Sequence, residues 1–213
     1  MSDWTKNISV SDGLFTKEEI QENWLGCIGE KWKHGWGESE SPLYWHVPLT
    51  SDMHRWTSPS NLYDAARTEI SIEQDWVKNI WNKINVGDLK FLRIYLNGHT
   101  AGQPGGIHTD GASTDQYTII YYANPDWTPY DGGTIEFWTP NLDEKQKATA
   151  TDTIYANPMA SPRDQEPDIL RAYWPKPGRV VTFDARIPHC ATAVHPMSKK
   201  FRVSLVFKCI KTA

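Results

Sequence analysis

The sequence predicts a mainly β protein, a sandwich or barrel, with helices packed on its outside. From Leu89 onward, short runs of β-branched and aromatic residues are separated by Gly, Pro, Asn and Asp, which is typical of many short strands. Residues 1–88 instead contain two stretches with helical spacing. At 213 residues, the chain is long enough for one well-buried domain. We therefore expect a single domain over 1–213, with a helical support layer in 1–88 and a β core in 89–213.

Two helices are expected in the support layer. The first covers residues 16–27, whose apolar side chains recur near helical spacing and whose first turn is acidic. The second opens after Ser71, where Gln74 three residues on completes a capping-box pattern, and its apolar residues repeat at every fourth position until Gly87. Between the helices, residues 31–46 are rich in Gly and Trp without a steady period, which predicts irregular structure or a short hairpin.

Six strands are expected in the β core, each bounded by turn-forming residues. In chain order they are LKFLRIYL (89–96), QYTIIYYA (116–123), GTIEFW (133–138), ILRAYW (169–174), RVVTFD (179–184) and FRVSLVFKCI (201–210). Residues 141–167 interrupt this series with a polar stretch that holds three prolines and no firm period. Such an insertion is long enough to be a functional lid or a mobile connection.

Composition narrows the class of protein. Lys and Arg number 22 against 26 Asp and Glu, and no basic cluster interleaves with aromatic residues, so we expect no nucleic-acid partner. No apolar run is long enough to span a membrane, and the chain opens without a signal-peptide pattern. Cys27, Cys190 and Cys209 are an odd set without Cys-x-x-Cys spacing. This pattern disfavours a disulfide framework or a thiolate zinc site, and we expect a cytoplasmic protein.

Five polar residues form the candidate functional site. His108 and Asp110 make a His-x-Asp pair that, taken alone, also fits a solvated turn. His189 follows the predicted strand at 179–184. Arg202 lies at the start of the last predicted strand, and Ser204 is on the same face of that strand. Two imidazoles and a carboxylate can hold one face of an octahedral iron(II) and leave three positions open. An arginine beyond the metal can pair bidentately with the far carboxylate of a chelating dicarboxylate.

The stretch from about Leu89 to Ile210 resembles the iron(II)/2-oxoglutarate-dependent dioxygenases, in their prolyl-hydroxylase branch. Besides the five residues above, YTIIYYANPDWTPYDGGTIEFW is similar to the strand, YY-x-N-x-DW turn and GG hairpin of hypoxia-sensing prolyl hydroxylases and their microbial relatives. The IPH that ends at the second histidine matches as well. The resemblance implies a double-stranded β-helix, or jelly-roll, core over 89–213 with the insertion at 141–167.

The resemblance also implies a role for each residue of the motif. It assigns His108, Asp110 and His189 to iron(II), and Arg202 to the C5 carboxylate of 2-oxoglutarate with Ser204 as an added contact. These three metal ligands are then the catalytic centre.

Two tyrosines and one ambiguous cation complete the implied cosubstrate pocket. Tyr121, the first of the paired tyrosines, matches a tyrosine that bonds the same carboxylate, and Tyr95 resembles one that lines the pocket. The family often has its basic residue nine or ten positions after the second histidine, where this chain has Lys199. We prefer Arg202, because RVSLVF alternates as a final strand should and a longer loop is simpler than a shifted strand. A contribution from Lys199 or Lys200 stays open.

The implied activity is hydroxylation with iron(II), 2-oxoglutarate and dioxygen, supported by ascorbate, with release of succinate and carbon dioxide. The expected substrate is a prolyl residue in a peptide or protein, and a small molecule or free amino acid is the alternative. A non-catalytic jelly-roll binding protein is the alternative from another class, and it is disfavoured because the ligand set and the basic anchor occur together. A zinc hydrolase is weaker still, since no separate general base is apparent. The sequence leaves the oligomeric state open.

Overall fold

The structure is a computed structural model that describes residues 3–35, 44–50, 71–84, 89–140 and 168–211. The predicted insertion at 141–167 therefore lies outside the described residues. Within them the protein is mainly β, as predicted, with two α-helices and two short 3-10 turns, η1 (Trp4–Asn7) and η3 (Pro129–Asp131). The single-domain prediction and the cytoplasmic location stay predictions.

A major sheet of seven strands forms the centre of the fold. Its spatial order is β1-β8-β5-β10-β4-β3-β2, and every neighbouring pair is antiparallel. The strands are β1 (Ile8–Ser11), β2 (Lys33–His34), β3 (Trp45–Pro48), β4 (Leu89–His99), β5 (Gln116–Tyr122), β8 (Val180–Asp184) and β10 (Arg202–Lys211).

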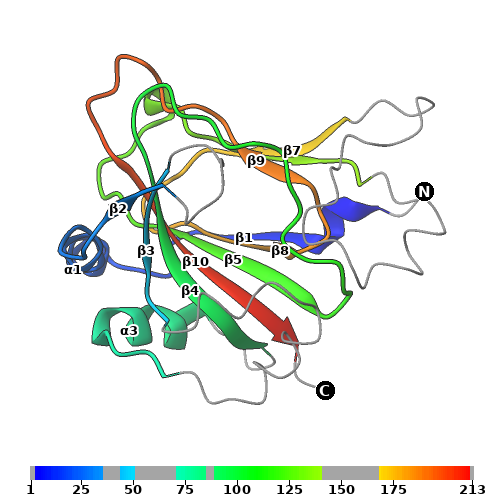
Figure 1. Ribbon diagram of the computed structural model, residues 1–213, viewed down its shortest axis with the longest axis horizontal. Helices are drawn as coiled ribbons and strands as arrows, with labels where there is room; N and C mark the ends of the chain where they lie inside the picture. The colour runs from blue at the N-terminus through cyan, green and yellow to red at the C-terminus, as the bar shows by residue number, and fades with distance from the viewer. Residues whose placement is uncertain (1–2, 36–43, 51–70, 85–88, 141–167, 212–213) are drawn as a thin grey trace.

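A minor sheet of three strands packs against one face of the major sheet. Its order is β7 (Ile169–Tyr173), β6 (Ile135–Trp138) and β9 (His189–Ala191), and an antiparallel bridge from His108 to His189 extends it beyond β9. In Figure 1, β7 and β9 lie above the strands of the major sheet. Apolar side chains of both sheets, such as Phe137 and Phe183, fill the space between them. The arrangement is the predicted double-stranded β-helix.

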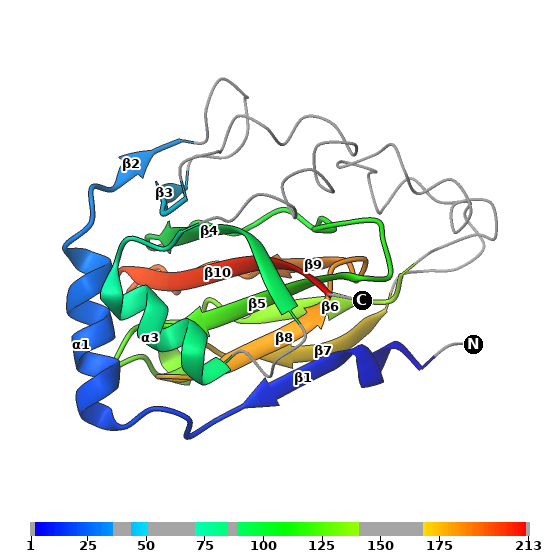
Figure 2. The same cartoon turned by 90° about the horizontal axis from the view of Figure 1, so that it is seen from below.

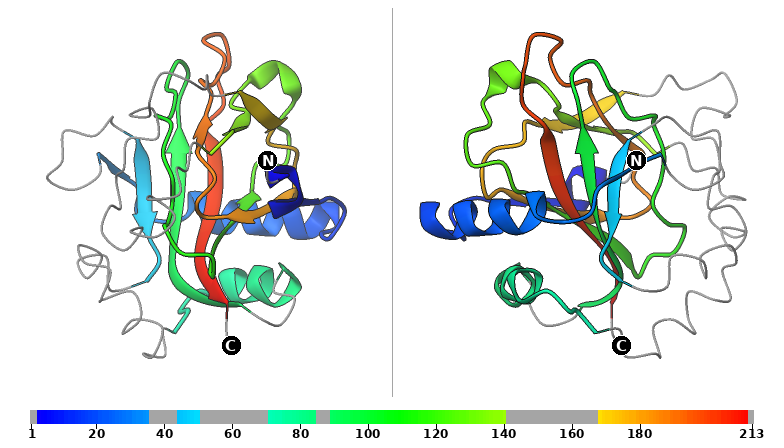
Figure 3. Two further views of the ribbon diagram at one scale, coloured as in Figure 1. Left: turned by 90° about the vertical axis from the view of Figure 1, so that its right-hand side faces the viewer. Right: turned by 60° about the vertical axis from the view of Figure 1, so that its left-hand side comes forward.

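Helices cover the opposite face of the major sheet, as Figures 2 and 3 show from two directions. The first, α1 (Lys17–Ile28), confirms the prediction, and Thr16 and Glu19 form a reciprocal capping box at its start. The second, α3 (Asp75–Ile84), lies beside it and buries the apolar face that the sequence predicted. No helix in the described part of the chain is long and apolar enough to cross a membrane.

Two predictions for the N-terminal part need correction. The second helix begins at Asp75, because the carbonyl of Gln74 accepts its first main-chain bonds and the Ser71 capping box is not used. Residues 1–88 are also not purely helical, since β1 pairs with β8 and β3 pairs with β4. Strands of four residues are too short for a reliable alternation signal. The Gly- and Trp-rich segment forms the short β2 and β3 pair.

Strict alternation along β10 sends two kinds of side chain to its two faces. Val203, Leu205 and Phe207 point to the helices and belong to the apolar cluster beneath them. Val206 points between the two sheets, and Arg202, Ser204 and Lys208 share its face of the strand. The polar residues of this last strand therefore face the interior of the jelly roll, where the candidate site lies.

Candidate metal centre

Three polar side chains come together at one end of the space between the sheets. One ligand atom from each of His108, Asp110 and His189 lies within 4.8 Å of the others. The main chain fixes this meeting, because His108 and His189 exchange two N–H to carbonyl bonds of 3.0 and 2.9 Å. The amide of Asp110 also donates to the carbonyl of Ala185 at 2.8 Å. The structure thus brings the three predicted metal ligands together.

Each histidine has its ring oriented by the main chain. Nδ1 of His108 lies 2.8 Å from the carbonyl oxygen of Gly106, and Nδ1 of His189 lies 2.9 Å from that of Ile187. A carbonyl only accepts, so both Nδ1 atoms carry hydrogen and both Nε2 atoms keep a lone pair in the neutral ring. These Nε2 atoms lie 3.4 and 3.3 Å from the carboxylate oxygens of Asp110. Lone pairs that face a carboxylate fit a cation between them, as metal-binding histidines do.

The carboxylate of Asp110 remains an anion in this setting. Its side chain is only 6% exposed, which by itself would raise its pKa. The nearby ammonium of Lys208 nevertheless holds the pKa of Asp110 well below its usual value. Burial lowers the pKa of His189, which favours the neutral imidazole that a metal requires. Together the three groups match the donor set of a divalent metal.

Sequence reasoning missed two residues that contact this carboxylate. Thr118 Oγ1 donates to Asp110 Oδ2 at 2.7 Å, and the Nζ of Lys208 makes an ion pair with the same oxygen. Lys208 Nζ also lies 3.3 Å from Thr118 Oγ1. No motif marks either residue. The alternation that placed Arg202 on the interior face would, however, have placed Lys208 there too, because the two are six positions apart.

Arg202 forms a second polar centre at the start of β10. Its side chain is fully enclosed, its guanidinium carbon lies 5.3 Å from the ring centre of Tyr122, and among the described residues no carboxylate pairs with it. Its Nε and the hydroxyl of Tyr122 are both buried without a hydrogen-bond partner. Buried donors of this kind are rare unless a ligand or water satisfies them. The pair therefore fits an anionic ligand, and a planar guanidinium suits a carboxylate.

The remaining predicted site residues divide between the two faces of the sheet. Tyr95 packs in the inter-sheet core, with the Nζ of Lys208 5.9 Å from its ring centre. Ser204 is buried on the same face of β10 as Arg202. Lys199 is exposed in the preceding loop, so it does not take the place of Arg202.

Tyr121 is the one predicted site residue that the structure places elsewhere. Its hydroxyl accepts a hydrogen bond from Asn23 of α1 at 3.1 Å, and its ring packs edge-on against Phe15 beneath the helices. Successive residues of a strand point to opposite faces, so Tyr122, and not Tyr121, shares the interior with Arg202. Correcting the assignment by one position moves the tyrosine to the other side of the sheet.

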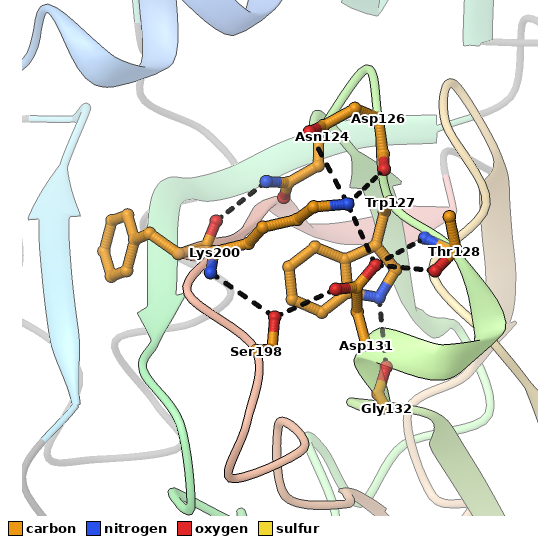
Figure 4. A network of polar contacts seen from close by, with 9 residues as sticks. Asn124, Asp126, Trp127, Thr128, Asp131, Gly132, Ser198 and Lys200 are labelled. Atoms are coloured by element: carbon orange, nitrogen blue, oxygen red, sulfur yellow. Dashed lines mark hydrogen bonds and ion pairs between the residues drawn. The ribbon is translucent and has the colours of Figure 1, made fainter.

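Asn124 holds the main chain on both sides of Arg202, and it belongs to the polar network drawn in Figure 4. The Asn124 amide donates to the carbonyl of Phe201 and accepts from the amide of Val203, both at 2.7 Å, so its two bonds lie on either side of Arg202 in the chain. Next to it, Lys200 binds Asp131 at 3.0 Å across the two loops. We call Asn124, Asp131 and Lys200 the arginine clasp. It explains what Asn124 of the YY-x-N-x-DW stretch and Asp131 of the turn after it do in the fold.

A buried histidine completes the surroundings of Arg202. His99 faces Arg202 across the β4 and β10 pair, and its ring stacks on Tyr44 with centres 4.7 Å apart. Burial, helped by the positive charge of Arg202, lowers the pKa of His99 to about 3. His99 is therefore neutral at ordinary pH and adds no charge that would compete for an anion.

Comparisons with known proteins agree with this arrangement. A family model described as the 2OG-Fe(II) oxygenase superfamily matches residues 91–207. No curated protein matches the chain. Among solved structures, a Pseudomonas putida prolyl-4-hydroxylase has a TM-score of 0.53 at 13% identity, covering 97% of this chain and 94% of that chain.

Two further solved structures show how widely the fold is shared. A prolyl hydroxylase from Trichoplax adhaerens, in complex with a hypoxia inducible factor peptide fragment, has a TM-score of 0.53 at 14% identity, covering 97% of this chain and 84% of that chain. The α-ketoglutarate-dependent epimerase SnoN from nogalamycin biosynthesis has a TM-score of 0.61 at 14% identity, covering 96% and 78%. At such identities the likeness concerns the fold.

Proposed function

The chain belongs to the 2OG-Fe(II) oxygenase superfamily, and from that premise we propose that it hydroxylates prolyl residues in a peptide or protein. It is accordingly a 2-oxoglutarate-dependent dioxygenase with iron(II) as its metal. When bound, the iron activates dioxygen and couples the oxidation of 2-oxoglutarate, to succinate and carbon dioxide, to hydroxylation of the substrate. The protein supplies the ligands, the orientation of the cosubstrate and the exclusion of water.

His108, Asp110 and His189 are the metal ligands and the catalytic centre in this proposal. The observation that carries it is the pair of Nε2 lone pairs directed at the Asp110 carboxylate, each fixed by an Nδ1 bond to the main chain. Two imidazoles and one carboxylate match the ligand preference of non-haem iron(II) and cover only one face of the metal. The proposal leaves the other face for 2-oxoglutarate and dioxygen.

Arg202 holds the far carboxylate of 2-oxoglutarate in this proposal, with Tyr122 and Ser204 beside it. The support is the enclosed guanidinium with no carboxylate partner in the described residues, together with the unsatisfied Tyr122 hydroxyl. A cosubstrate carboxylate would satisfy both donors at once. Tyr95, whose ring centre lies 5.9 Å from the Nζ of Lys208, lines the same inter-sheet space in this proposal.

The choice of a prolyl substrate rests on likeness to two hydroxylases. The YY-x-N-x-DW turn and GG hairpin are similar to those of prolyl hydroxylases, and two proteins named as prolyl hydroxylases share the fold, one of them with a bound peptide. A peptide also needs an open approach to the metal, and the side chain of His108 is 53% exposed. A small molecule or free amino acid is the alternative that the experiment must separate.

The test is to incubate the protein with iron(II), 2-oxoglutarate and ascorbate, and to offer proline-rich peptides, free amino acids and a cell lysate in parallel. We expect succinate release together with the mass gain of one oxygen atom on a proline within a peptide. Hydroxylation confined to free amino acids, or to a residue other than proline, would overturn the substrate proposal alone. Absence of 2-oxoglutarate turnover and binding would overturn the assignment of the site as well.

A further inference from the structure

Lys208 contacts the candidate metal centre, but the proposed function gives this lysine no role. Lys208 lies on β10 directly opposite Thr118 of β5, and its side chain is only 12% exposed. Its ammonium contacts Asp110 Oδ2 and lies 3.3 Å from Thr118 Oγ1. A permanent positive charge beside a divalent metal weakens metal binding by repulsion, so the lysine carries an electrostatic cost at this position.

The contacts of Asp110 show what the lysine does there. Oδ2 accepts from both Thr118 Oγ1, at 2.7 Å, and the ammonium of Lys208, which uses the lone pairs of that oxygen. Each oxygen also has one imidazole Nε2 nearby, His108 at 3.4 Å from Oδ1 and His189 at 3.3 Å from Oδ2, but Oδ1 has no hydroxyl or ammonium donor in the described residues. Among the described residues, Oδ1 is therefore the carboxylate oxygen whose lone pairs remain for a metal.

We propose that Lys208 is a positioning residue that holds Oδ2 of Asp110 away from the metal, so that Asp110 binds through Oδ1 alone. This inference rests on the proposed metal ligands. A carboxylate that binds through one oxygen leaves three positions of an octahedral metal open, enough for the two oxygens of 2-oxoglutarate and for dioxygen. A carboxylate that chelates through both oxygens leaves two. Lys208 thus lowers the affinity for the metal but keeps one more coordination position open.

Replacing the lysine should change metal affinity and turnover in opposite directions. In Lys208→Met the repulsion is gone and only Thr118 still donates to Oδ2, so we expect manganese(II) to bind at least about threefold more tightly than in the wild type. The visible band that forms when 2-oxoglutarate is added to the iron(II) protein without oxygen should weaken. Succinate formation should fall roughly 10- to 100-fold, the usual cost of removing a partner of a metal ligand. A lysine that only supports the fold would lower both quantities together.

Two further variants keep the experiment decisive. Lys208→Arg retains a cation and donors toward Oδ2, so it should recover most of the band and part of the turnover. Lys211→Met removes an exposed lysine at the end of the same strand and should behave as the wild type. Thermal unfolding of all variants identifies any that fail to fold, in which case Lys208→Arg against Lys211→Met carries the comparison.

The outcomes distinguish a failure of this inference from a failure of the proposed function. If Lys208→Met keeps band and turnover within about twofold of Lys211→Met, or loses metal binding and turnover together, Lys208 does not position Asp110. If the wild type and Lys211→Met themselves bind neither manganese(II) nor 2-oxoglutarate, the ligand assignment fails, and the inference fails with it. Tighter metal binding with a weakened band in Lys208→Met alone supports the inference.

Discussion

Arg202 and Lys208 lie on the same face of the same strand, yet their surroundings differ completely. Lys208 has an acid of the protein itself, Asp110, as its partner. Arg202 is more deeply enclosed and has no carboxylate partner among the described residues. An enclosed cation is costly to keep without a counter-charge. The comparison indicates different roles for the two cations. Lys208, which pairs with an acid of the protein, positions that acid, whereas Arg202, which has no such partner, is available to bind a ligand.

The two ends of the strand are also supported in different ways. Near Lys208, main-chain bonds between the loops hold His108 and His189 in place. Near Arg202, side chains do this work, because the arginine clasp of Asn124, Asp131 and Lys200 ties two loops together around it. Substitutions should therefore damage the two ends separately, and the following experiments use that separation in order of expected effect.

Removing a proposed metal ligand should abolish activity. His189→Ala deletes one imidazole of the proposed centre and should abolish succinate formation, since the two remaining groups no longer define one face of a metal. His108→Ala should do the same. Metal titration and a turnover assay check this result. Turnover in His189→Ala comparable to the wild type would contradict the ligand assignment.

Removing Arg202 should weaken the binding of 2-oxoglutarate and leave metal binding unchanged. Arg202→Ala loses a charge-assisted bidentate contact worth roughly 2 to 4 kcal/mol, so the 2-oxoglutarate concentration needed for half-maximal rate should rise on the order of 30-fold or more. Manganese(II) affinity should stay at the wild-type value. Lys199→Ala is the matched control, because that side chain is exposed and should leave the requirement unchanged. The opposite result for the two variants would place the anchor at Lys199.

The neutral histidine beside Arg202 makes stability depend on pH. The unfolded chain takes up a proton at His99 below its ordinary pKa of 6.5, whereas the folded chain does so only near its pKa of about 3. Stability from this residue is therefore complete above pH 6.5 and is lost as the pH falls toward 3, by at most about 1.4 kcal/mol per pH unit.

Urea unfolding of wild type and His99→Gln at pH 7 and pH 5 measures this term. The wild type should lose about 2 kcal/mol more than the variant over that interval. Asp12 and Asp131, whose lowered pKa values are about 2, titrate below the chosen window. An equal loss in both proteins would show that His99 is charged in the folded state.

The tyrosine pair gives the smallest but most specific test. Tyr122→Phe removes the unsatisfied hydroxyl beside Arg202 and should raise the 2-oxoglutarate requirement several-fold, by about 1 kcal/mol, with little change in stability. Tyr121→Phe removes the bond from Asn23 and should cost about 1 kcal/mol of stability with the requirement unchanged. Kinetics and thermal unfolding of both variants check the assignment. If the two results are exchanged, the corrected tyrosine is wrong.

The tyrosine correction shows how far the sequence could go. The alternation of RVSLVF placed Arg202 and Ser204 on one face because a strand has a period of two and a clear apolar face. In QYTIIYYA both faces are buried, so the apolar pattern does not distinguish Tyr121 from Tyr122. A shift of one residue reverses the face. The contacts of Thr118 with Asp110 and of Tyr122 with Arg202 show which face of β5 lies toward the site.

Other features escaped prediction for different physical reasons. The strands β1 and β3 are four residues each, and tertiary pairing rather than local pattern makes them strands. Lys208 was overlooked because a lysine beside metal ligands belongs to no motif and depends on a partner, Asp110, far away in the chain. The three residues of the candidate metal centre could be predicted because their order and their placement relative to the strands resemble a known family.

The reciprocal main-chain bonds between His108 and His189 also bear on how the site opens. Because each residue donates to the carbonyl of the other, the loop of His108 and strand β9 cannot separate without breaking both bonds. The two imidazoles therefore form one cooperative unit, and local fluctuations that release one release the other. Amide hydrogens of the two residues should exchange with solvent at matching, slow rates. Escape of a bound ion would then follow the kinetics of this shared opening rather than the breaking of a single ligand bond.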